Sequence, residues 1–210
     1  MANTLSSQPN AQTFVLADIV EEVRAGKVRI PRFQRGLRWQ WEDVRRLFDS
    51  ILKGYPIGSF LFWQRQGPKA QIRIGSLTVD APKGDALWIV DGQQRITSLV
   101  NALSALDGLD PRFSLGFDLK AKALRKPSER DPSHVIPLPV FFDLQKLILW
   151  FSEHKDLDPS LLNGASTSTV PHACSNSQEL RPRRGLHVLR AVVPTPGLLV
   201  AIQRPVEPLC

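Results

Sequence analysis

The stretch that most constrains the fold is residues 88–99, where a short apolar run stops at an Asp-Gly pair and a helical pattern begins. Three polar side chains follow this pair: Gln93, Gln94 and Arg95. Apolar residues then recur at the spacing of one helical face: Ile96, Leu99, Val100, Leu103 and Leu106. This order predicts a strand, a tight turn and a helix, with the polar cluster on the first helical turn.

The start of this predicted helix has the chemistry of an anion site. The first backbone amides of a helix lack partners inside the helix and carry a positive partial charge. Gly92 lets the backbone approach a ligand without a Cβ in the way, and Arg95 adds a permanently charged, planar guanidinium. The cluster therefore indicates phosphate binding. A plainer interpretation stays open, in which Asp91 and Gly92 serve turn chemistry alone and Arg95 is an exposed surface charge.

A second informative segment, residues 30–39, is basic, polar and aromatic at once. Its arginines recur at every third position with aromatic rings between and after them: Arg32, Phe33, Arg35, Arg38 and Trp39. Such interleaving suits stacking on bases together with phosphate contacts. The alternative is that the aromatic residues belong to the core and the arginines are merely exposed.

Hydrophobic periodicity predicts the remaining elements. Helices are expected over residues 16–25, 41–53 and 144–154. Strands are expected over residues 28–30, 59–63, 87–90 and 113–117, with edge strands over 72–79 and 137–142. In the first of these strands, Arg29 alternates with the apolar Val28 and Ile30. Residues 120–137, which are charged and contain proline, are predicted to form a loop.

Composition narrows the class of protein. With 210 residues, of which 42% are hydrophobic and 22% charged, the chain is typical of a soluble globular protein. The net charge of +7 permits an anionic partner such as nucleic acid without requiring one. The two cysteines, Cys174 and Cys210, form no metal-ligand spacing and no disulfide framework. No signal peptide and no apolar run near the roughly 18 residues of a membrane span are found, so we expect a cytoplasmic protein without membrane contact.

Both ends of the chain differ in character from its middle. Residues 1–13 are polar with little to bury, so we expect them to be disordered. Residues 156–210 are first rich in small polar residues and then carry six prolines from Pro171 onward. We expect a disordered or aberrant tail here, or the product of a truncation or frameshift. The apolar piece at residues 198–202 could form a strand, but its flanks argue against one.

Two motifs carry a resemblance to a known family. The first is Ile30-Pro31-x-Phe33-Gln34-Arg35, together with a helix that ends in Gly-Tyr-Pro-Ile-Gly-Ser at residues 54–59. The second is Val90-Asp91-Gly92-Gln93-Gln94-Arg95. Over residues 14–155 the chain resembles the N-terminal domain of GmrSD-type restriction enzymes, within the ParB/sulfiredoxin-like superfamily. The resemblance implies an α+β fold, a small mixed sheet with packed helices, followed in this chain by the irregular tail.

The resemblance also implies a nucleotide site at the Asp-Gly-Gln-Gln-Arg turn, where relatives bind and hydrolyse NTP in defence against phage or other foreign DNA. Carried over to this sequence, the catalytic residues are Asp91, Gln94 and Arg95. The nucleotide would be bound by Gln34, Arg35, Gly92, Gln93, Gln94, Arg95 and Thr97. Asp91 would hold Mg²⁺ or orient water, with a helix N-cap role as its alternative, and Thr97 could instead bond back to its own helix.

Three functions stay open on these grounds. The first is an NTP-binding, NTP-hydrolysing sensor domain of a modification-dependent DNA restriction system. Its partners would be nucleotide, DNA and a separate nuclease domain or subunit, because we recognise no His-Asn-His-type nuclease pattern after residue 155 and expect no DNA cleavage by this chain alone. The second is a non-catalytic DNA-binding module that uses residues 32–39. The third is an inactive truncated remnant.

Overall fold

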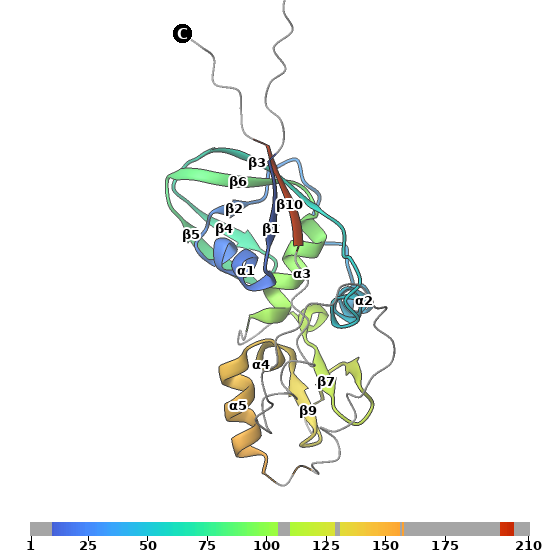
Figure 1. Ribbon diagram of the computed structural model, residues 1–210. Helices are drawn as coiled ribbons and strands as arrows, with labels where there is room; N and C mark the ends of the chain where they lie inside the picture. The colour runs from blue at the N-terminus through green and yellow to red at the C-terminus, as the bar shows by residue number, and fades with distance from the viewer. Residues whose placement is uncertain (1–9, 105–109, 129–130, 156, 158–197, 204–210) are drawn as a thin grey trace, which may run out of the picture. The chain divides into compact units, whose positions relative to one another are not determined.

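The chain divides into two compact units in the computed structural model, which describes residues 10–104, 110–128, 131–155, 157 and 198–203. The first unit comprises Met1–Leu115 with Thr195–Cys210, and the second comprises Gly116–Pro194. Helices and small sheets alternate along the chain, which confirms the predicted α+β class (Figure 1). In the described part of the chain, no helix combines the length and apolarity that a bilayer span requires.

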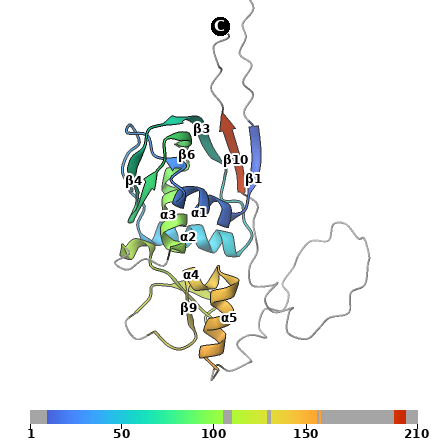
Figure 2. The same cartoon turned by 90° about the vertical axis from the view of Figure 1, so that its left-hand side faces the viewer.

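The first unit is built on a five-stranded sheet with the order β1-β10-β3-β6-β2. Its strands are β1 (Asn10–Phe14), β2 (Val28–Arg29), β3 (Phe60–Gly67), β6 (Gly84–Asp91) and β10 (Leu198–Gln203). The antiparallel pair of β3 and β6 forms its centre, and β2 lies parallel to β6. On the other side, β10 lies between β1 and β3, antiparallel to the first and parallel to the second (Figure 2).

Strands β1 and β10 correct two expectations about the ends of the chain. We expected disorder through residue 13 and argued against a strand at residues 198–202, whereas Asn10 pairs with Ile202 and Phe14 with Leu198. Those expectations were wrong because each strand finds its partner far away in the sequence, which local composition does not reveal. Apart from Leu157, the rest of the predicted tail lies outside the described residues, and the domain limits at 14 and 155 stay a prediction.

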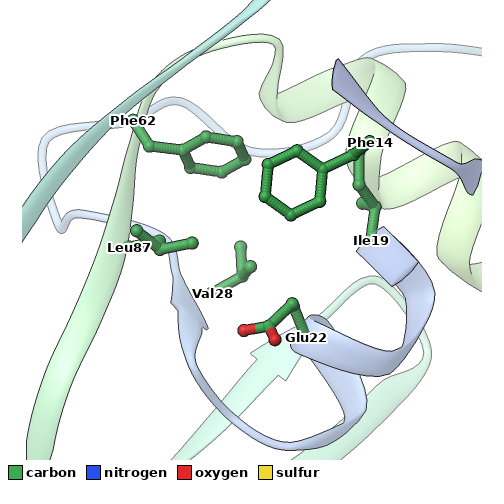
Figure 3. Close-up of a pocket in the computed structure, with 6 residues that line it drawn as sticks. All are labelled: Phe14, Ile19, Glu22, Val28, Phe62 and Leu87. Atoms are coloured by element: carbon green, nitrogen blue, oxygen red, sulfur yellow. The ribbon is translucent and has the colours of Figure 1, made fainter. Parts of the chain in front are cut away.

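Three helices supply the core of the first unit: α1 (Leu16–Arg24), α2 (Trp41–Leu52) and α3 (Gln93–Leu103). All three were predicted, because each carries an apolar stripe at helical spacing. α1 packs against the sheet face that carries Phe62 and Leu87, and a small apolar hollow lies between them (Figure 3). The carboxylate of Glu22 lies at the edge of this hollow and pairs with Lys27 at 2.8 Å.

A hairpin of β4 (Ala70–Ile74) and β5 (Leu77–Ala81) forms a separate two-stranded sheet, as the predicted edge strands indicate. The fully buried Asn101 of α3 fixes its turn. The Asn101 amide donates to the Ile74 carbonyl at 2.9 Å, and its Oδ1 accepts from the Ser76 N–H at 2.7 Å. Gly75 in this turn has φ +65°, and a Cβ there would clash with the Asn101 carboxamide.

The segments after α3 differ more from the prediction. The expected strand at residues 113–117 is replaced by the 3-10 helix η1 (Pro111–Phe113) in the first unit and by β7 (Gly116–Asp118) in the second. The predicted loop contains β8 (Ala123–Arg125) and β9 (Val135–Pro137), which flank β7 in a three-stranded sheet. The expected edge strand at 137–142 is the short helix α4 (Leu138–Phe141), whose early proline suits a first helical turn. The predicted final helix is confirmed as α5 (Leu144–Glu153).

Candidate functional site

The turn between β6 and α3 has the predicted strand–turn–helix form. β6 ends at Asp91, α3 begins at Gln93, and Gly92 between them has φ +95°, a conformation that favours glycine. Gly92 itself is the N-cap residue and no side chain caps the helix. The N-cap alternative for Asp91 is therefore wrong. The Asp91 carboxylate is 72% exposed and pairs with the guanidinium of Arg95 at 3.1 Å.

Arg95 is fixed in place rather than free in solvent. Its side chain is only 19% exposed, and Nη1 donates to the backbone carbonyl of Ile57 at 2.7 Å. The guanidinium also lies over the ring of Phe60, 4.9 Å from the ring centroid. The interpretation of Arg95 as a plain surface charge is therefore wrong.

Two glycines make room for this arrangement. A Cβ on Gly58, whose φ is +83°, would come within 2.6 Å of Arg95 Nη1. A Cβ on Gly92 would collide with the Phe60 ring, on which the guanidinium lies. Arg95 can take its position only because both residues lack side chains.

An open pocket of about 330 Å³ lies between α2, the segment after it and Arg95. Its lining residues are Trp39, Asp43, Arg46, Leu47, Ser50, Pro56, Ile57 and Arg95. The two guanidinium groups give the pocket a positive wall. The lining also includes one carboxylate, that of Asp43, which accepts a hydrogen bond of 3.0 Å from the backbone N–H of Gln40.

Of the two arginines that line the pocket, Arg46 is held by fewer contacts than Arg95. Its side chain is 71% exposed, and its Nε lies 3.7 Å from Glu42, beyond hydrogen-bond distance. Glu42 is held instead by Arg45, whose hydrogen bonds lower the pKa of Glu42 below its usual range despite the opposing desolvation. Arg46 can therefore turn toward a ligand without breaking a short ion pair.

The two glutamines of the motifs link segments of backbone. Gln34 donates from Nε2 to the carbonyl of Val90 at 3.0 Å, next to Asp91. Gln94 Oε1 accepts the backbone N–H groups of Arg38 at 2.8 Å and Trp39 at 3.2 Å, and its Nε2 donates to the Gly36 carbonyl at 3.2 Å. Hydrogen bonds between glutamine side chains and backbone thus join the two motifs. Gln94 also fixes the backbone of Trp39, which lines the pocket together with Arg95.

The other predicted site residues lie outside this pocket lining. Arg35 is exposed, Gln93 is half-buried, and Thr97 is buried with 2% exposure and no hydrogen-bond partner for its hydroxyl. Arg46 was not predicted as a site residue, because an arginine on the polar side of an amphipathic helix has the pattern of any other surface charge. The signal that could have located the pocket wall is Gly58 in the segment after α2.

Comparison with known proteins gives the class and then the family. The family model of the GmrSD restriction endonuclease N-terminal domain matches residues 16–180. This match places the chain in a class of restriction-system components. It belongs to the GmrSD N-terminal domain family, which confirms the resemblance of the two motifs. An uncharacterized protein of Methanocaldococcus jannaschii is 28% identical over 158 residues, a match that covers 70% of this chain and 22% of that protein.

Proposed function

We propose that the first unit binds a nucleoside triphosphate, with the phosphate chain in the pocket beside Arg95. The observation that carries this proposal is that Arg46 and Arg95 both line one pocket, whose described carboxylate, Asp43, already accepts a hydrogen bond at the start of α2. Asp91 offsets the charge of Arg95 from 3.1 Å. Arg46, in contrast, has only a longer contact of 3.7 Å with Glu42, so the lining keeps a positive character that favours an anionic ligand. The volume of about 330 Å³ is in the range of small-molecule sites.

Hydrolysis is the further step of this proposal. Arg95 offsets the negative charge that grows in the transition state of phosphoryl transfer, where a fixed cation contributes most. Asp91 would hold Mg²⁺ or orient the attacking water, and Mg²⁺ would offset phosphate charge when bound. One exposed carboxylate combined with waters and phosphate oxygens is an arrangement that Mg²⁺ accepts. Asp91 would hold Mg²⁺ in this way while its Oδ2 stays paired with Arg95 at 3.1 Å.

The remaining motif residues take supporting roles. Gly92 and Gln93 lie at the start of α3, where amides lack partners inside the helix, and would bind phosphate oxygens that extend beyond the pocket lining. Gln34 and Gln94 position the surrounding backbone. Arg35, on the exposed segment, reaches the ligand from outside. Thr97 takes no direct part in this version, because only 2% of it is exposed.

A second function, DNA contact, is favoured by the exposed part of the first motif. Phe33 is 80% exposed and lies between the exposed Arg32 and Arg35, so ring and charges are accessible together. In the proposed sensor of a restriction system, this segment contacts modified DNA in the cytoplasm. Gln94 relays the state of the pocket to it. The chain spans 22% of its relative's length, and a nuclease domain or subunit is proposed as its partner.

Thermal unfolding of the full chain with each NTP, with and without Mg²⁺, tests the proposal. We expect one or more NTPs to raise the Tm, since a ligand of the native state stabilises it by mass action. Arg46→Ala should reduce the rise and Arg95→Ala should abolish it. Lys53→Ala, which removes an exposed charge outside the pocket lining, should leave it unchanged.

Three results would count against it. A folded wild-type chain whose Tm no NTP changes would refute nucleotide binding. An equal rise in Arg46→Ala and wild type would refute this pocket as the site. DNA affinity that falls steeply with salt but does not depend on NTP would instead favour the non-catalytic DNA-binding module. A chain that shows neither an NTP-induced Tm shift nor DNA binding would favour the inactive remnant.

A further inference from the structure

We infer that a second surface of the first unit binds single-stranded nucleic acid by stacking bases on Trp63 and Trp88. We call this surface the tryptophan face and define it by Arg29, Trp63, Arg65 and Trp88. It lies on the opposite side of the sheet from Phe62 and Leu87, against which α1 packs. The inference does not depend on the proposed nucleotide pocket.

The ladder places three of these side chains in one row across three strands, and the fourth, Arg65, lies beside the row on β3. Trp63 of β3 lies directly opposite Trp88 of β6, and Trp88 lies opposite Arg29 of β2. Arg65 follows Trp63 by two residues, so the two share a face of β3. Figure 1 shows β3, β6 and β2 in the same sheet. Neighbouring strands lie about 4.8 Å apart, so the two rings come from directly adjacent positions.

The outer end of the row combines an accessible ring with an accessible charge. Trp63 is 41% exposed, unusually high for so large an apolar side chain on a central strand. The guanidinium of the exposed Arg65 lies over its ring, 4.5 Å from the centroid. A base stacked at Trp63 therefore has a cation within reach of its phosphate.

The inner end adds a buried positive charge. Arg29 is 2% exposed, donates to the carbonyls of Pro68 and Pro82 at 2.5 Å each, and lies 5.8 Å from the Trp88 ring centroid. Its partners are neutral, and its Nε has no hydrogen-bond partner in the described structure. A buried cation without a carboxylate leaves a positive potential that an approaching anion can offset.

No acidic side chain in these three strands offsets the row. β3 contains no Asp or Glu, and β2 contains none. The two acidic residues of β6 lie at its ends, where Asp85 accepts a hydrogen bond from Gln66 and Asp91 pairs with Arg95. The face is therefore aromatic and positive.

This chemistry selects an unpaired strand over the other occupants. Bases in a duplex hide their faces from a ring on a sheet, whereas unpaired bases present them, and stacking platforms with adjacent cations are a common way of binding single strands. A second copy of the chain would bring the same arginines to the contact, which like-charge repulsion disfavours.

The test is a titration of a fluorescently labelled 15-nucleotide oligothymidine with the full chain at low salt, followed by fluorescence anisotropy. Stacking predicts that Trp63→Leu binds about tenfold more weakly, while Trp63→Phe, which keeps an aromatic face, stays close to wild type. Arg65→Ala should weaken binding and lower the salt dependence, by about 0.7 in log–log slope if Arg65 neutralises one phosphate. Arg73→Ala, an exposed arginine on β4 outside the row, is the matched control and should bind as wild type.

Further readouts keep the outcome decisive. Quenching of tryptophan fluorescence at saturating oligonucleotide should be strong in wild type and clearly smaller in Trp63→Leu, which keeps only Trp88 of the two stacking rings. Folded Trp63→Leu and Arg65→Ala variants that bind as tightly as Arg73→Ala would overturn the inference. Equal competition by duplex, or a dimer that Trp63→Leu dissociates, would also overturn it.

Discussion

Arg95 donates a hydrogen bond to the backbone carbonyl of Ile57 at 2.7 Å, and this contact makes the guanidinium part of the pocket wall. The carbonyl belongs to the segment that follows α2, so the helix start and the end of α2 are joined across 38 positions of the sequence. The position of Arg95 therefore depends on a segment that contains no charged residue between Gly54 and Phe60.

Gly58→Ala should displace Arg95, whereas Gly54→Ala should not. Both glycines have positive φ, +83° and +70°, so each substitution costs about 1–2 kcal/mol of backbone strain. A Cβ meets Arg95 Nη1 at position 58 and nothing within 4 Å at position 54. We expect a comparable decrease of Tm in the two variants but loss of the NTP-induced shift in Gly58→Ala alone. Equal shifts in both would contradict this role of Gly58.

Gln94→Ala should loosen the segment of residues 36–39. The substitution removes the acceptor for two backbone N–H groups and the donor to Gly36, and each missing hydrogen bond costs about 0.5–1.5 kcal/mol. Hydrogen exchange at the Arg38 and Trp39 amides should accelerate. Gln94→Glu keeps the acceptor and should protect both amides better than Gln94→Ala. If exchange is unchanged in Gln94→Ala, the segment is held by other contacts.

Two buried polar side chains of α3 should respond oppositely to removal. Asn101→Leu leaves the Ser76 N–H and the Ile74 carbonyl without their partners, which should cost about 2–4 kcal/mol of unfolding free energy. The Ser98 hydroxyl is fully buried and has no hydrogen-bond partner among the described residues, so Ser98→Ala should be neutral or slightly stabilising. Urea unfolding of both variants checks the pair. A large destabilisation in Ser98→Ala would show that its hydroxyl has a partner after all.

Asp118 should make the second unit sensitive to acid. Burial alone would raise the pKa of Asp118, but the N–H donors of Ala121 and Lys120 and the charges of His134 and Arg125 outweigh burial and lower the pKa below its usual 3.8. A lowered folded-state pKa stabilises the fold above pH 3.8, and this contribution is lost as the pH falls through the lowered value.

Asp118→Asn removes this titration from the second unit. At neutral pH the variant should be less stable than wild type, and its stability should depend less on pH between about 5 and 2. Urea unfolding of the full chain, followed by circular dichroism at several pH values, measures both effects. The same pH dependence in the variant and in wild type would exclude Asp118 as the responsible group.

Local pattern located the centre of the site but not its surroundings. The turn at Gly92 and the helix that carries Arg95 follow from a strand-ending Asp-Gly pair and an apolar stripe. Arg46 could not be predicted as a site residue, because the other arginine of the pocket, Arg95, comes from another helix. The glutamines were predicted to be nucleotide ligands, whereas the side chain of Gln94 accepts a hydrogen bond from the backbone N–H of Arg38, far away in the sequence.

The same limit explains the errors in the fold. Alternation in the short strand β2 does not reveal that Arg29 is buried, because the Pro68 and Pro82 carbonyls that accept its hydrogen bonds flank the distant β4–β5 hairpin. β10 pairs with β1 across nearly the whole chain. Such partners depend on tertiary structure, which periodicity over ten residues does not contain.

Equilibrium titration of the NTP that gives the largest thermal shift tests the nucleotide pocket most directly. Binding to wild type and to Lys53→Ala should occur at one site per chain with the same Kd. Arg46→Ala should raise the Kd about tenfold, equivalent to about 1.4 kcal/mol, and Arg95→Ala should abolish measurable binding. If Arg46→Ala and Arg95→Ala both bind the nucleotide with the wild-type Kd, the nucleotide does not bind beside Arg95.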